Sequence, residues 1–161
     1  MDPSSTASVT EFAIAIAGFT GLVLALGSRD GVANPLVKLR TVTMLFYAFT
    51  AAFGSLLPTF GQALGINEVW RFSSYVLIAL LIANVAATIG SSRVLLTAEQ
   101  RTQLKRWMWS LVLVGNSFFS LLLVAALAGV VGLPVTGAFY GALIWQLVLS
   151  TVLFARLILE E

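Results

Sequence analysis

The feature that most constrains this chain is a succession of five long apolar stretches separated by short polar segments. Only 10% of its 161 residues are Asp, Glu, Lys or Arg, whereas a soluble domain usually carries charge on about a quarter of its residues. So few charged side chains cannot cover a water-facing surface. We therefore expect an integral membrane protein whose excess apolar side chains face lipid.

The length of these stretches predicts helices that cross a bilayer. A hydrocarbon core about 30 Å thick is spanned by ~20 apolar residues in a helix, and a helix satisfies its own backbone polar groups. The sequence thus predicts an all-α, polytopic membrane bundle that forms one domain over residues 1–161. The five expected transmembrane helices cover residues 9–27, 35–64, 68–92, 98–131 and 137–159.

Short polar segments between the stretches carry signals for helix ends. Asn34 and Pro35 suit a cap followed by the first helical position, where the missing proline N–H does no harm. Asn67 is a residue type that caps helices. Thr97 and Gln100 have the spacing of a reciprocal capping box, which predicts a helix start there.

The distribution of Lys and Arg predicts the orientation of the chain. The connections after the first and third stretches are basic, whereas the connection after the second contains Arg71 as its single basic residue. Short basic loops stay on the cytoplasmic side, which places the N-terminus outside and the C-terminus in the cytoplasm. Short loops and the absence of glycosylation sequons favour a bacterial inner (plasma) membrane.

Missing residue types limit the chemistry of the chain. It contains neither Cys nor His, which excludes disulfides, thiolate nucleophiles, thiolate or imidazole metal ligands, and haem held by His. A Ser or Thr nucleophile would lack a nearby base, and the basic residues do not gather along one face as nucleic-acid binding requires. We expect no enzymatic activity, no metal site, no cofactor and no nucleic-acid partner.

Polar residues recur near mid-membrane and are the first candidates for function. Hydroxyls can bond back to their own helix, but an amide in hydrocarbon needs partners or water. Hydrogen bonds between helices are the commoner role for such amides in membrane interiors, and a wet pore or ligand cavity is the alternative. The candidate lining residues are Thr50, Asn84, Asn116, Ser117, Ser120 and Gln146.

Small residues repeat at spacings of four in the first and last stretches, at Ala17, Gly21 and Ala25 and again at Gly137 and Gly141. Such faces allow the backbones of two helices to approach closely, so that van der Waals packing holds them together. We favour packing within one subunit over packing between subunits.

A basic cluster lies between the third and fourth stretches. Its members are Arg93, Arg101, Lys105 and Arg106. Basic residues at this place commonly serve only to set topology, and the alternative is binding of anionic lipid head groups.

Two function classes remain open. The recurrence of polar residues at similar depth leads us to expect a homo-oligomeric channel or passive transport protein with a pore lined by neutral polar groups. The alternative is a non-catalytic accessory subunit or scaffold. In either case the expected partners are membrane lipids, further copies of the chain or other membrane proteins.

Overall fold

The computed structural model describes residues 35–102, 106–130 and 132–159, together with Glu11, Ile14, Ala15 and Gly18. For residues 101–102, 106–109 and 157–159 the description covers the backbone alone. Regular structure in these ranges is entirely helical. The helices are α2 (Pro35–Ala63), α3 (Val69–Leu95), α4 (Ala98–Thr102), α5 (Arg106–Leu127) and α6 (Val135–Leu159). Most of the first expected span, 9–27, lies outside the described residues.

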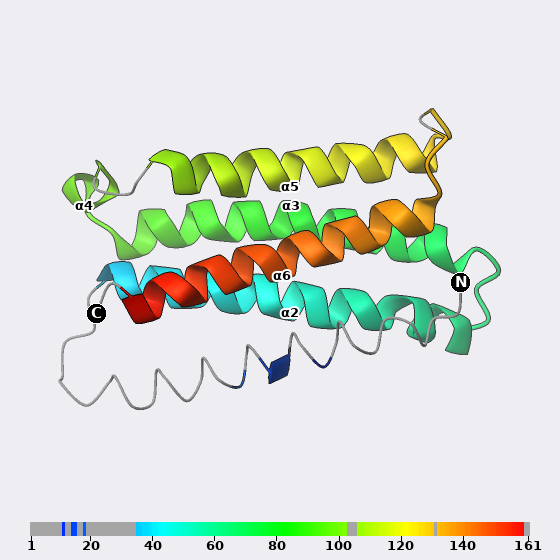
Figure 1. The fold of residues 1–161 in the computed structure, drawn as a ribbon, viewed down its shortest axis with the longest axis horizontal. Helices are drawn as coiled ribbons and strands as arrows, with labels where there is room; N and C mark the ends of the chain where they lie inside the picture. The colour runs from blue at the N-terminus through cyan, green and yellow to red at the C-terminus, as the bar shows by residue number, and fades with distance from the viewer. Residues whose placement is uncertain are drawn as a thin grey trace.

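The four long helices form an up-and-down bundle (Figure 1). α2 and α5 each pack against both α3 and α6, and α3 also touches α6. Helices that follow one another along the chain are therefore neighbours in space, as short connections require. The start of α2, helix α4 and the end of α6 lie at one end of the bundle, which we call the α4 end. The α2–α3 and α5–α6 connections lie at the opposite end (Figure 1).

Four helices of the described chain contain segments long and apolar enough to cross a membrane: Pro35–Ala63, Val69–Leu95, Ser110–Leu127 and Val135–Arg156. The shortest has 18 residues, which at a rise of 1.5 Å cover about 27 Å. Large apolar side chains point out of the bundle. Phe53, Leu121 and Val94 are 61%, 68% and 84% exposed, for example. Lipid is the medium that suits this surface, so the chain is an integral membrane protein built from transmembrane helices.

Two of the predicted helix starts can be compared with the structure. The expected start of α2 at Asn34 and Pro35 falls at the edge of the described chain, because the residues before Pro35 lie outside it. The expected cap at Asn67 is wrong, because the residue that precedes α3 is Glu68, whose side chain makes no capping hydrogen bond. The Thr97 capping box is confirmed. The Gln100 N–H donates to Thr97 Oγ1 at 3.3 Å, and the Thr97 N–H donates to Gln100 Oε1 at 3.1 Å.

The segment expected as a single helix over 98–131 is described as two, the short α4 and the long α5, with residues 103–105 outside the described ranges. α5 ends at Leu127, before the expected boundary. The chain turns there through Gly129, whose φ of 70° is a conformation that glycine adopts without steric cost.

α6 begins at Val135 rather than at residue 137. The Pro134 carbonyl accepts hydrogen bonds from the N–H groups of Gly137 at 3.0 Å and Ala138 at 3.2 Å. The first turn of the helix therefore closes on the proline that was expected to lie outside it.

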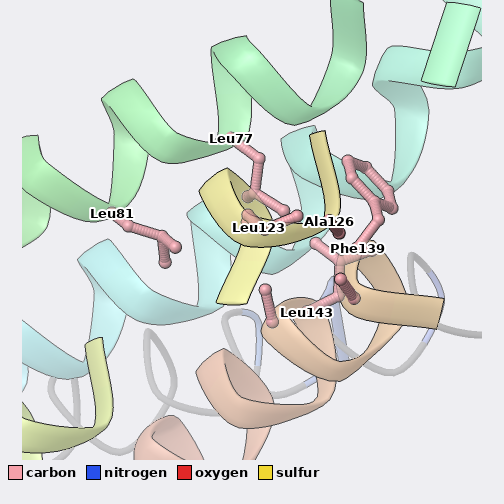
Figure 2. Packing of buried hydrophobic residues seen from close by; sticks show 8 residues of the cluster. Leu77, Leu81, Leu123, Ala126, Phe139 and Leu143 are labelled. Atoms are coloured by element: carbon pink, nitrogen blue, oxygen red, sulfur yellow. The ribbon is translucent and has the colours of Figure 1, made fainter. Parts of the chain in front are cut away.

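Apolar side chains fill the bundle in two main clusters. The first joins α3, α5 and α6 toward the end opposite α4. It contains Leu77, Leu81, Leu123, Ala126, Ala138, Phe139, Ala142 and Leu143 (Figure 2). The second joins α2, α5 and α6 and contains Met44, Tyr47, Val112, Leu149 and Leu153. In lipid, close packing of such side chains holds helices together but only weakly fixes their register, because lipid tails are equally apolar.

Candidate functional site

A layer of polar side chains lies where the two apolar clusters meet, and we call it the polar layer. It consists of Tyr47 and Thr50 from α2, Asn84 and Thr88 from α3, Asn116 from α5 and Gln146 from α6. No member exposes more than 6% of its surface. Along α6, Gln146 lies between Leu143 of the first cluster and Leu149 of the second.

Three amides in this layer form a directional chain of hydrogen bonds that joins all four long helices. Asn84 Nδ2 donates to Thr50 Oγ1 at 2.8 Å and to Gln146 Oε1 at 3.1 Å. Gln146 Nε2 donates to Asn116 Oδ1 at 2.7 Å. Asn116 Nδ2 then donates to the backbone carbonyl of Val112 at 2.8 Å. The chain ends on a backbone acceptor of its own helix.

A second set of hydrogen bonds attaches α2 to its neighbours. The Tyr47 hydroxyl lies 3.2 Å from Thr88 Oγ1 on α3. Closer to the α4 end, Ser150 Oγ on α6 donates to the Met44 carbonyl of α2 at 3.3 Å. These bonds thus tie α2 to α3 and to α6.

Helical spacing places these side chains where they can meet. Tyr47 and Thr50 are three residues apart on α2, and Asn84 and Thr88 are four apart on α3, so each pair shares one face of its helix. A buried amide without partners costs a few kcal/mol. Rotations of the helices that separate these faces are therefore disfavoured, and the layer specifies how the helices align.

The chemistry available in the layer is hydrogen bonding between neutral groups. Tyr47 is its single titratable member, and the described ranges contain no group of His, Cys, Asp and Glu side chains that could hold a metal ion.

The structure brings together four of the six predicted lining residues. Thr50, Asn84, Asn116 and Gln146 meet in the polar layer. Ser117 is instead exposed on the outside of α5, and Ser120 is half-buried. Sequence reasoning missed the other two members of the layer, Tyr47 and Thr88. Their signal was the helical spacing to Thr50 and Asn84, although a tyrosine in an apolar stretch is more readily assigned to a membrane interface.

Only part of the predicted small-residue pattern lies in the described chain. Ala17, Gly21 and Ala25 fall outside it. Gly141 packs within the subunit, where a Cβ atom would lie 3.2 Å from Phe119 Cε1 on α5. Gly137 is exposed, and a Cβ there would approach Pro134 of its own connection at 3.5 Å.

A close approach between α5 and α6 involves a glycine that the small-residue pattern did not single out. The indole ring of Trp145 on α6 lies so near Gly115 on α5 that a Cβ atom would overlap it. Phe119, which is also on α5, stacks on the indole ring of Trp145 with ring centroids 5.6 Å apart. An isolated glycine inside a helix often marks such a contact, and this was the available signal.

The basic cluster is only partly described. Arg93 is exposed near the end of α3. Arg101 lies in α4 and Arg106 begins α5, both at the α4 end of the bundle, and Lys105 is outside the described residues.

A groove between α2 and α3 adjoins the polar layer on the lipid-facing side of the bundle. Its volume is about 260 Å³. The lining residues are Phe46, Phe49, Thr50, Phe53, Leu80, Ala83, Asn84 and Ala87. Thr50 and Asn84 are therefore the members of the layer that border it, whereas Asn116 and Gln146 lie deeper in the bundle.

Comparisons of the chain with protein-family models, curated proteins and solved structures find no match.

Proposed function

We propose that this chain is a non-catalytic membrane module, an accessory subunit or scaffold that associates with other membrane proteins. The observation that carries the proposal is the amide chain from Asn84 through Gln146 to Asn116. A water-filled path needs polar groups that face the path. In this bundle the amides face one another and are at most 4% exposed, which supports a role in holding the helices in register.

We place the whole chain, residues 1–161, in one transmembrane domain with five spans, the N-terminus outside and the C-terminus in the cytoplasm. The distribution of charge supports this orientation. Lys38, Arg93 and Arg156 lie toward the α4 end, whereas Arg71 is the basic residue of the opposite end in the described chain. The positive-inside rule puts the α4 end in the cytoplasm. A bacterial inner membrane remains our proposed location.

Lipids are further proposed partners. The exposed Arg93, together with the basic residues of the α3–α5 segment, offers positive charge at the α4 end for anionic head groups.

A homo-oligomeric channel is the second candidate, favoured by a single observation. Ser117 is exposed on the lipid-facing side of α5, between the exposed Val114 and Leu121. A pore would then have to form between copies rather than through one bundle.

Flux measurements on reconstituted protein test the choice between these functions. We expect vesicles that contain the wild-type protein to leak ions and small neutral solutes no faster than empty vesicles. Ser117→Leu and Asn116→Leu separate a pore between copies from one within the bundle. Wild-type flux that either substitution reduces, with the amount of assembled protein unchanged, would contradict the scaffold proposal and favour the channel.

A further inference from the structure

A second hollow lies at the end of the bundle opposite α4, where α2 ends and α3 and α6 begin. Its volume is about 440 Å³. We call it the interfacial pocket, and its lining includes Gln62, Asn67, Glu68, Trp70, Arg71 and Val135. It contains one carboxylate, one guanidinium and two carboxamides in a chain that has little other charge.

The charged pair in this pocket is accessible to a ligand. Arg71 Nη1 donates to Glu68 Oε2 at 3.0 Å, and the two side chains are 52% and 66% exposed. An ion pair this exposed contributes little to stability. A ligand that carries both charges can therefore bind each partner without leaving a charge unpaired. A ligand with a single charge would satisfy one partner and be repelled by the other.

The pocket lies at the depth of lipid head groups. Trp70 packs edge-on against Phe139 with ring centroids 5.7 Å apart, and against Tyr140 at 6.0 Å. Tryptophan and tyrosine gather at the membrane–water interface. Phe60 on α2 and Leu64 just after its end flank Gln62 in sequence and are 57% and 59% exposed, so apolar surface for an acyl chain adjoins the polar pocket.

We propose that the interfacial pocket binds a phosphate ester that carries a primary ammonium group, as in the head group of phosphatidylethanolamine. Arg71 holds the phosphate through charge-assisted hydrogen bonds, and the carboxamides of Gln62 and Asn67 donate to its remaining oxygens. Glu68 accepts hydrogen bonds from the ammonium group. A choline head group lacks the N–H donors that Glu68 requires, and an anionic head group without an ammonium leaves Glu68 opposed to negative charge. The site is independent of the function proposed above.

Lipid competition on the purified, delipidated protein tests this assignment. Native mass spectrometry would count bound phosphatidylethanolamine, phosphatidylcholine and phosphatidylglycerol of identical acyl chains offered in equal amounts. We expect retention of phosphatidylethanolamine to exceed that of each competitor by about fivefold or more. Glu68→Gln should remove the preference over both competitors, and Arg71→Gln should lower retention of all phospholipids. Glu99→Gln and Lys38→Gln, exposed charges at the α4 end, serve as matched controls and should change nothing.

The results that overturn the proposal are equally specific. Equal retention of phosphatidylethanolamine and phosphatidylcholine by the wild type would do so, as would an undiminished preference in Glu68→Gln. Soluble glycerophosphoethanolamine, added alone, distinguishes the source of the ligand. Binding of this compound at the affinity of the lipid would assign the site to a free solute, whereas much weaker binding would assign it to the membrane.

Discussion

Gln146 is the residue on which the hydrogen bonds of the polar layer converge. It accepts from Asn84 and donates to Asn116, and it is completely buried. Leucine at this position would leave an N–H of Asn84 and the Oδ1 atom of Asn116 without their partner. We expect Gln146→Leu to lower the free energy of unfolding by about 1–2 kcal/mol, measured by unfolding in detergent.

Ser74→Ala is the matched control for that experiment. Ser74 is equally buried, but its hydroxyl has no hydrogen-bond partner in the described chain. Removing an unsatisfied hydroxyl costs no hydrogen bond, so the stability of this variant should equal or slightly exceed that of the wild type. A loss as large as that in Gln146→Leu would mean that burial alone, rather than pairing, determines the cost.

Gly115 allows a separate prediction at the residue scale, because a substitution there changes side-chain volume rather than hydrogen bonding. A methyl group there overlaps the Trp145 ring, on which Phe119 also stacks. Since a ring cannot bend away as the end of a flexible side chain can, α5 and α6 would have to separate. We expect Gly115→Ala to destabilise the protein by about 1–3 kcal/mol. Gly90→Ala, where nothing lies within 4 Å, should be neutral or slightly stabilising.

Helix ends were predictable from the sequence to the extent that their signals are local. The Thr97 capping box acts through the chain immediately around it. The early end of α5 depends on the turn conformation at Gly129. The apolar pattern continues past this residue, so it does not show that the helix stops there.

The pairing within the polar layer was not predictable from one sequence, although most of its members were. Asn84 and Gln146 could be recognised as amides at mid-depth, but which amide meets which depends on the order and rotation of the helices. The contact of Tyr47 with Thr88 depends on α2 and α3 being neighbours with these faces turned toward each other. The Gly115–Trp145 contact likewise depends on the rotation of two helices about their axes.

At the scale of the helices, the number of spans can be tested by finding on which side of the membrane each connection lies. α2 starts and α6 ends at the α4 end (Figure 1), so a first span places the N-terminus at the opposite end. The chain has no cysteine, which permits labelling of the single substitutions Ser5→Cys, Asn67→Cys and Glu99→Cys. We expect a membrane-impermeant reagent to reach positions 5 and 67 from outside the cell, and position 99 only after the membrane is opened.

Two other labelling patterns would contradict the proposed topology. If position 5, like position 99, reacts only after the membrane is opened, while position 67 reacts from outside, the first stretch does not cross the membrane. Reaction of position 99 from outside would invert the orientation. Neither pattern would alter the bundle of α2, α3, α5 and α6.

For the molecule as a whole, the polar layer and the apolar clusters have different roles. Apolar packing attracts the helices to one another in many alternative registers. The hydrogen bonds of the amide chain, in contrast, are satisfied in one arrangement of the helices. Replacement of a whole buried polar set by apolar residues of similar volume is often neutral or stabilising, even where loss of one partner is costly. The combined variant Thr50→Val, Asn84→Leu, Asn116→Leu and Gln146→Leu should therefore unfold at a temperature at or above that of Gln146→Leu alone.

The same combined variant should lose its unique alignment while keeping its stability. Spin labels on cysteines introduced at Glu99 and Leu133 report the distance between the two ends of the bundle, and pairs on the exposed faces of α3 and α6, at Ile82 and Ile144, report register. We expect one narrow distance distribution for the wild type and a broader or multiple distribution for the combined variant, most strongly for the α3–α6 pair. A narrow distribution in both proteins would show that apolar packing alone sets the register. The amides would then have to be retained for another reason, of which the lining of a path for solutes is the nearest alternative, because Thr50 and Asn84 border the α2–α3 groove.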